Sequence, residues 1–195
     1  HLQSKRFESG RCRMRESPQF HPHSKAGRPA VEALLDLSFG PARQQRTASL
    51  LRAGASRIDQ ASFRLLANGA LLGSVECWEL QWHGQGQSRR IAMLGPIAVH
   101  PDHRAHGIGA QLMERALAEL DRLQLAVMLI GDEPYYGRWG FSPRHTGGWV
   151  LPGPVERNRL LLRAPVPQQF AGAATFSAIS PAIPSIARPT ARSAA

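Results

Sequence analysis

The segment HPDHRAHGIGAQL, which begins at His100, carries histidine, arginine and glycine residues at spacings that suit several kinds of chemistry. His100, His103 and His106 recur at every third position, and imidazole is a common metal ligand. However, Pro101 and Gly107 favour a loop over a helix, and no cluster of Cys, Asp or Glu residues supplies further ligands. We therefore expect no metal site here.

The glycines of the same segment indicate a different use, the binding of a phosphate. Gly107, Ile108 and Gly109 begin like a dinucleotide-binding loop, but the third glycine is absent, and no Gly-Lys-Ser/Thr follows as in a P-loop. What remains is a glycine-rich turn into a helix at Ala110, where unpaired N–H groups and the helix dipole attract a phosphate or pyrophosphate. Arg104 would add a charged donor. A tight turn without a ligand is the alternative.

The apolar run MLGPIAV, which leads into this segment, contains Gly95 and Pro96 inside an otherwise regular strand pattern. Proline cannot donate to a β-ladder and glycine weakens one, so we expect a bulge or splay where pairing with the neighbouring strand fails. The N–H groups of Ile97, Ala98 and Val99 could then meet a ligand. An edge strand with no ligand is the alternative. Strand donors followed by a phosphate-binding helix start would suit a long cofactor with a carbonyl at one end.

Hydrophobic periodicity predicts the helices that position these residues. A helix is expected over 29–40 and a second over 42–52, before the AGAS break. The longest helix follows the glycine turn, because one apolar stripe recurs at helical spacing through Leu112, Met113, Ala116, Leu117, Leu120 and Leu123.

Turn residues predict the strands. Asn68 and Gly69 favour a tight hairpin, and residues 83–88 punctuate a second one, so three strands form an antiparallel meander. The continuous apolar run 125–131 reads as a strand buried on both faces, which implies a parallel crossover through the long helix. A short helix and turn in DEPYYGRWGF and a last strand in NRLLLRAPV complete the pattern.

Composition limits the class of protein. The chain has 195 residues, of which 43% are hydrophobic and 19% charged, and no apolar run approaches the ~20 residues that cross a membrane. We expect one folded domain over 29–166, between a basic, poorly ordered segment 1–28 with a short strand in RCRMRE and a disordered Ala/Pro/Ser-rich tail over 167–195. The unpaired contexts of Cys12 and Cys77 favour a reducing, cytoplasmic compartment.

Two segments resemble motifs of the GNAT superfamily of acyl-CoA-dependent N-acyltransferases. LGPIAVHPDHRAHGIGAQLMERAL is similar to that family's strand followed by R/Q-x-x-G-x-G/A, and PYYGRWGF is similar to its F/Y-Y-x-K/R-x-G-F signature. The resemblance extends over about 29–165. The sequence is also similar to a bacterial subgroup of predicted acetyltransferases. The resemblance implies an α/β fold: a twisted mixed sheet whose central strands splay apart, with helices on both faces.

The resemblance also implies a cofactor site, for acetyl-CoA as co-substrate. The amides around Ile97 and Val99 would hold the pantetheine arm and the acetyl carbonyl. The pyrophosphate would bind Arg104 and the backbone of residues 104–110, without use of the His106 or Ile108 side chains.

Direct transfer of the acetyl group to a primary amine is the reaction that the resemblance implies. Only a neutral amine attacks, whereas a lysine-like amine of pKa ~10.4 is protonated at neutral pH, so a base should assist. Tyr136 occupies the position of the family's tyrosine acid and would protonate the departing CoA thiolate. Packing against Trp139 and Phe141 is its alternative role.

Several groups could serve as the base, and the sequence does not choose among them. Glu76 and Glu79 lie on opposite faces of one strand, so at most one of them points into the cleft. His100 has a suitable pKa but lies in a loop, and Asp132 and Glu133 could simply cap the short helix.

Two other functions remain open at this point. A noncatalytic module that senses acetyl-CoA would need the same strand and loop but not Tyr136. The formal charge of +10 suggests nucleic-acid binding as another function. However, much of the excess charge lies in residues 1–28, and no aromatic platform accompanies it. The acceptor amine could belong to a small molecule or a protein, and the oligomeric state stays open, a homodimer included.

Overall fold

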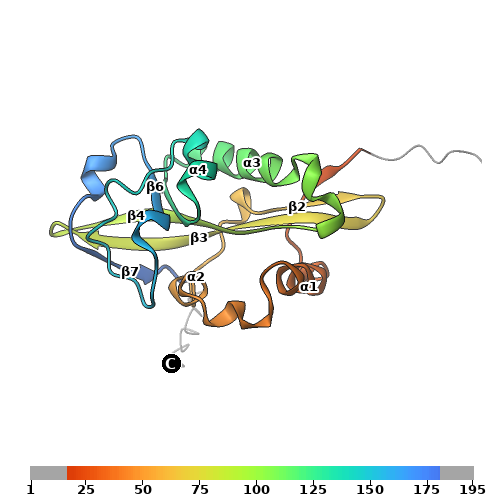
Figure 1. The fold of residues 1–195 in the computed structure, drawn as a ribbon, viewed down its shortest axis with the longest axis horizontal. Coiled ribbons are helices and arrows are strands. Elements are labelled where there is room, and N and C mark those ends of the chain that lie inside the picture. Colours follow the sequence, from red (N-terminus) through yellow and green to blue (C-terminus); the bar gives the residue numbers. More distant parts are fainter. Residues whose placement is uncertain (1–16, 181–195) are drawn as a thin grey trace, which may run out of the picture.

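A seven-stranded mixed sheet with helices on both faces forms the part of the chain that this computed structural model describes, residues 17–180 (Figure 1). The strands are β1 (Gln19–Pro22), β2 (Phe63–Ala67), β3 (Ala70–Gly84), β4 (Gln87–Val99), β5 (Ala126–Ile130), β6 (Leu160–Arg163) and β7 (Ala174–Ala178). The helices are α1 (Arg28–Phe39), α2 (Thr47–Leu51), α3 (Ile108–Arg122) and α4 (Glu133–Tyr136). Within residues 17–180, no helix is both long and apolar enough to cross a membrane.

Both predicted hairpins are confirmed. Asn68 and Gly69 join β2 to β3 with φ angles of 49° and 78°, and Gln85 and Gly86 join β3 to β4 with φ angles of 53° and 69°. Positive φ at both central positions matches the right-handed twist of the strands. The sheet runs in the order β1-β2-β3-β4-β5-β6, and all neighbouring strands are antiparallel except β4 and β5.

The two faces of the sheet carry different helices: α3 and α4 cover one, and α1 and α2 the other (Figure 1). The apolar stripe of α3 packs against the sheet as predicted, and each fully buried aliphatic side chain contributes about 1.5–3 kcal/mol. Leu123 is the exception, because it follows the end of the helix and is 37% exposed. The buried α3 residues are Ile108, Leu112, Met113, Ala116, Leu117 and Leu120.

The predicted second helix over 42–52 is broken in two. Residues Pro41–Gln45 form a 3₁₀ helix, the backbone is extended at Arg46, and α2 is only five residues long. Tertiary contacts cause the break: the Arg43 guanidinium binds carboxylates of α1, and the Thr47 hydroxyl donates to the Pro154 carbonyl at 2.6 Å. These contacts outweigh the local helical periodicity.

The two ends of the described region also differ from expectation. The first strand is β1, which pairs with β2, whereas the predicted strand in RCRMRE lies outside the described residues. Residues 167–180, expected to be disordered, form a 3₁₀ helix (Pro167–Phe170) and β7. Strand β7 pairs with the second half of β3, beyond the end of β2, so a free ladder edge orders a segment whose composition carries no strand pattern.

Replacement of Phe170 tests this ordering. Its ring is buried and packs edge-on against Trp82, with 5.3 Å between centroids. Phe170→Ala should lower the free energy of unfolding by about 3–5 kcal/mol, because the truncation leaves a cavity in the core. Val166→Ala, at a position that is 47% exposed, should change it by less than about 0.5 kcal/mol. Equal effects in chemical denaturation would contradict the ordered arrangement.

Candidate active site

The parallel pairing of β4 and β5 stops early and opens the sheet. The two strands pair only over Ile91–Met93 and Ala126–Met128, after which β5 continues beside β6 alone. On its other edge β4 shifts register against β3 at the same level, where Gly95 has a φ of 127° and Pro96 lacks an N–H. The predicted splay is confirmed.

The direction of the β4 backbone beyond the splay follows from one hydrogen bond. The His100 N–H donates to the Leu72 carbonyl of β3 at 2.8 Å. Because N–H groups alternate sides along a strand, the Ala98 N–H also faces β3, whereas the N–H groups of Ile97 and Val99 face the opening. Two of the three predicted strand donors thus face the opening, and Ala98 is held in the ladder.

The glycine segment forms the start of α3. Residues Pro101–His106 make a 3₁₀ helix, Gly107 has a φ of 69°, and the first helical bond runs from the Gln111 N–H to the Gly107 carbonyl. The N–H groups of residues 108–110 therefore have no partner within the helix, and the positive end of its dipole lies at the same place.

Gly109 lies where three elements meet. A Cβ at this position would lie 3.7 Å from the Tyr135 hydroxyl and 3.7 Å from Val99 Cγ2, which is ordinary contact. The fold itself therefore has room for a small side chain at position 109. The end of β4, the start of α3 and α4 converge here, although they are distant in the sequence.

The three histidines of the segment lie next to one another with their rings tilted. Neighbouring ring centroids lie 5.8 Å and 6.0 Å apart, and His106 Nδ1 lies 3.3 Å from the His103 carbonyl. His100 Nδ1 lies 3.7 Å from an Asp102 carboxylate oxygen. Residues 17–180 contain no group of three or more His, Cys, Asp or Glu side chains placed to hold a metal ion. Arg104 and His106 are both exposed.

A cavity of about 730 Å³ occupies the opening in the sheet. Its floor comes from the parted strands, residues 93–97 of β4 and 129–130 of β5. Tyr136 forms part of its wall, and the remainder comes from residues 39–52 and 154–159. The cavity therefore joins the splay to the face of the sheet that α1 and α2 cover.

Tyr136 is the last residue of α4, and its ring packs against Gly131, the residue that follows β5. A side chain on Gly131 would collide with its ring. The ring centroid lies 6.2 Å from that of Trp139 and 6.4 Å from that of Phe141, so the predicted packing contacts exist. Because the same side chain also lines the cavity, packing fixes its position without removing it from the site.

Burial raises the pKa of the Tyr136 phenol. The nearby Tyr135 and Asp132 act in the same direction, and Arg159 opposes them. The phenol is consequently protonated at neutral pH and can donate a proton.

The family can be decided from the extent of the sequence match. Residues 20–144 match the acetyltransferase (GNAT) domain family. This chain belongs to the GNAT family. The match includes the parted strands, the glycine turn and Tyr136.

Relatives of this GNAT domain are found among both sequences and structures. A protein of Escherichia coli K12 named "Uncharacterized N-acetyltransferase YjhQ" is 26% identical over 141 residues, which covers 70% of this chain and 76% of the relative. The E. coli GNAT acetyltransferase YhbS, solved with CoA, has a TM-score of 0.63 at 20% identity and covers 82% of this chain and 89% of its own. A Brucella melitensis GNAT acetyltransferase, solved with acetyl-CoA, has a TM-score of 0.59 at 20% identity, with coverages of 81% and 94%.

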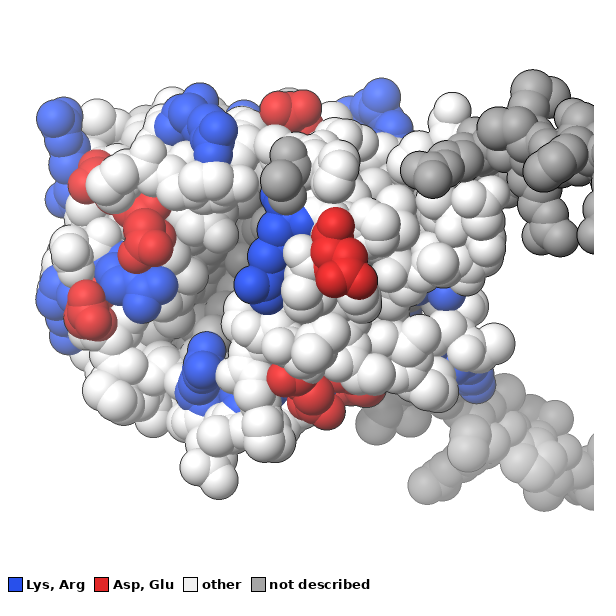
Figure 2. All heavy atoms as spheres, turned by 45° about the vertical axis from the view of Figure 1, so that its right-hand side comes forward, with Lys and Arg blue, Asp and Glu red and all other residues white. Residues whose placement is uncertain are grey.

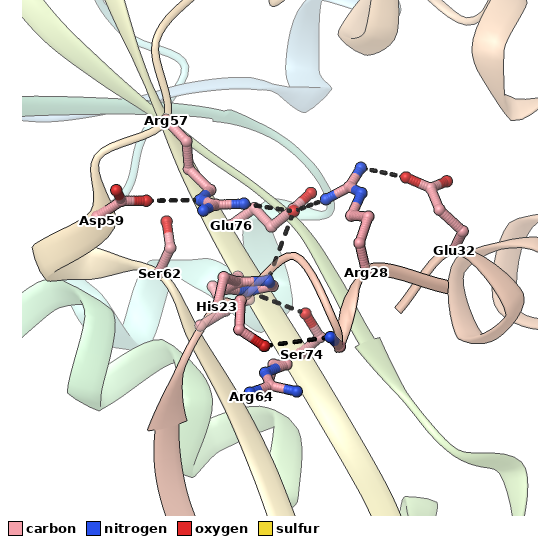
Figure 3. A network of polar contacts seen from close by, with 12 residues as sticks. His23, Arg28, Glu32, Arg57, Asp59, Ser62, Arg64, Ser74 and Glu76 are labelled. Atoms are coloured by element: carbon pink, nitrogen blue, oxygen red, sulfur yellow. Dashed lines mark hydrogen bonds and ion pairs between the residues drawn. The ribbon is translucent and has the colours of Figure 1, made fainter. Parts of the chain in front are cut away.

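Glu76, a candidate base, is buried inside a network of cations on the α1 face of the GNAT sheet (Figure 3). It pairs with Arg28, which also binds Glu32, and its carboxylate lies 3.9 Å from Arg57 and 3.8 Å from His23. Glu76 therefore balances the charge of nearby basic residues.

Two of the other candidate carboxylates are also paired, and the cavity wall holds residues that the sequence did not single out. Glu79 binds Arg90, and Asp132 lies 3.0 Å from Arg159. The wall instead contains Glu156 and several arginines from the α1–α2 region. No local motif marks them, because they reach the site only through the packing of residues 39–52 against 154–159.

Surface charge bears on the nucleic-acid alternative. On the face drawn in Figure 2, basic side chains border a hollow and acidic side chains lie close to them. A continuous basic surface, typical of nucleic-acid binding, is not present on this face. The basic residues of the N-terminal segment that raised this alternative lie mostly outside the described residues: Lys5, Arg6, Arg11, Arg13 and Arg15.

The network around Glu76 should make stability depend on pH through His23. Burial lowers the pKa of His23, with Glu76 opposing, so the folded state favours the neutral ring. Its contribution is complete above the unfolded pKa of about 6.5 and is lost as the pH falls below that value.

His23→Gln keeps a donor for the Val75 carbonyl, which lies 3.2 Å from His23 Nε2, but cannot titrate. We expect its melting temperature to fall less between about pH 7.5 and about pH 5.5 than that of the wild type. His21→Gln, at an exposed position of β1, is the matched control and should behave as the wild type. An unchanged acid sensitivity in His23→Gln would refute the assignment.

Proposed function

We propose that this GNAT domain transfers an acetyl group from acetyl-CoA to the nitrogen of a primary amine by direct attack on the thioester. One observation carries the proposal: where β4 and β5 part, two backbone N–H groups and the protonated Tyr136 phenol face one opening, beside the N-terminus of α3. The fold relatives solved with CoA and acetyl-CoA support the choice of co-substrate.

The proposed binding site follows the order of the elements. The pyrophosphate lies at the N-terminus of α3, held by the backbone of residues 107–110 and by the exposed Arg104. The pantetheine arm enters between the parted strands, and the thioester carbonyl accepts hydrogen bonds from the N–H groups of Ile97 and Val99. These donors stabilise the oxyanion that forms as the amine attacks.

Proton transfer completes the reaction. The new N–C bond forms as the C–S bond breaks, and the sulfur leaves with the electron pair. Tyr136 donates its proton to this sulfur as negative charge develops on it, and solvent then returns a proton to the phenolate. The amine nitrogen releases its own proton to solvent or to a base. Tyr136 is the catalytic residue that we assign.

Acetyl-CoA should stabilise the folded protein. At 100 times its dissociation constant the gain is about 2.7 kcal/mol, a rise of several degrees in melting temperature for a chain of this size. Gly109→Asp should abolish the shift, because its carboxylate would occupy and repel the pyrophosphate position. Gly147→Asp, at an exposed glycine with open space around it, should retain the shift. A shift that persists in Gly109→Asp would place the cofactor elsewhere.

Tyr136→Phe separates catalysis from binding. Phenylalanine keeps the ring contacts but removes the proton, so kcat should fall by about 10²- to 10⁴-fold while the stabilisation by acetyl-CoA is unchanged. The measurement is release of the CoA thiol in the presence of an amine. Equal turnover in both proteins would rule out Tyr136 as the acid, and a wild type that binds acetyl-CoA without any turnover would favour the sensing module.

A further inference from the structure

Apart from the parted strands and Tyr136, the lining of the cavity is basic. It is built by residues 39–52, which connect α1 to α2 and include α2, and by residues 154–159. Among the described residues that line the cavity, four are arginines and Glu156 is the one carboxylate; the arginines are Arg43, Arg46, Arg52 and Arg159. This wall lies on the α1–α2 side of the sheet, whereas the N-terminus of α3 lies on the other side (Figure 1).

Two of the arginines have their charge balanced by the protein. Arg43 donates to Asp36 Oδ1 at 2.7 Å and also binds Glu32. Arg159 Nε lies 3.0 Å from Asp132 Oδ1. Arg46 is exposed to solvent and donates to the Phe39 carbonyl at 2.9 Å. None of these three cations requires a ligand.

Arg52 differs from them. It is half-buried, its Nη2 donates to Ser49 Oγ at 2.8 Å, and within residues 17–180 no carboxylate lies within ion-pair distance of it. Glu76 attracts it from a longer distance but is already engaged by Arg28, and burial lowers the pKa of the Arg52 guanidinium. Partial removal of a cation from water is costly unless an anion compensates it.

We propose that Arg52 binds an anionic oxygen group of the acceptor, so that the acceptor is a small amine that also carries a carboxylate or a phosphate. This inference rests on the proposed acetyl transfer, because the same cavity must hold the acetyl group at one end and the acceptor at the other. A guanidinium donates two parallel hydrogen bonds to either kind of group. With the anion at Arg52, the amine end of the acceptor points toward the parted strands and Tyr136.

The same charges disfavour other acceptors. A polyamine or a lysine-rich protein tail would place additional positive charge against several arginines and a single glutamate. A neutral amine would leave Arg52 uncompensated. The substrate class therefore follows from the wall and not from the acetyl-CoA site.

The test compares matched amines with the wild-type protein at saturating acetyl-CoA: L-alanine with L-alaninamide, O-phosphoethanolamine with ethanolamine, and spermidine. We expect one anionic member of these pairs to have the highest kcat/KM. For alanine the comparison is stringent, because the amine of the amide is less basic and thus more available as free base. A preference for alanine identifies a carboxylate, and a preference for phosphoethanolamine identifies a phosphate.

Arg52→Gln should lower kcat/KM for the preferred anionic amine by about 10- to 100-fold, mainly through KM, with the thermal shift by acetyl-CoA unchanged. Arg122→Gln, which removes one exposed positive charge from α3 on the other face, is the matched control and should retain the preference. Preference for the neutral amines or for spermidine, or an unaltered preference in Arg52→Gln, would overturn the proposal.

A binding measurement separates this proposal from the proposed function. If acetyl-CoA binds but no amine is acetylated, the proposed acetyl transfer to these amines is refuted. Calorimetric titration of the CoA-saturated protein with alanine and with phosphoethanolamine then tests the anion site by itself. Binding that is lost in Arg52→Gln would support the site independently of catalysis. No binding to the wild type would refute it.

Discussion

The separation of two parallel strands after only three paired residues is the constraint on which the site depends. Backbone N–H and C=O groups need partners, so a sheet does not open at its centre unless something else satisfies them. Here β6 continues to pair with β5, and β3 continues to pair with β4, on their outer edges. Only the inner edges are left free, and a proline without an N–H lies where the pairing ends. The opening is thus bounded on both sides by strands that remain paired on their outer edges.

Charged side chains on the α1–α2 face of the sheet lie in two different environments. Glu76 is buried beside two cations, Arg28 and Arg57. The His23 ring, from the segment after β1, also lies beside it, so the network ties β1 and α1 to the centre of β3. Such a network is costly to break because removal of one partner leaves the others buried and unpaired. Arg52, close to the same network, lacks this compensation and faces the cavity. The contrast distinguishes charges that hold the fold from one that is available to a ligand.

Local sequence signals were sufficient to predict the hairpin turns, the long helix and the place where the strands part. The two hairpin turns, the apolar stripe of α3, and Gly95 with Pro96 each act through the conformation of their own few residues, so the structure agrees with their prediction. Residues 42–52 and 167–180 were mispredicted for the opposite reason. The first is bent by contacts of Arg43 and Thr47 with distant segments, and the second is ordered by the free edge of β3 and by the burial of Phe170.

The sequence by itself determined the family, both hairpins and the long helix after the glycine turn, because these follow from turn chemistry, periodicity and two ordered motifs. Only the tertiary structure decided which strand amides face the opening, that Glu76 is enclosed by cations, and that Arg52 and Glu156 belong to one cavity. The physical reason is distance along the chain. Pairing register and side-chain packing bring together residues about a hundred positions apart, and no local pattern records that proximity.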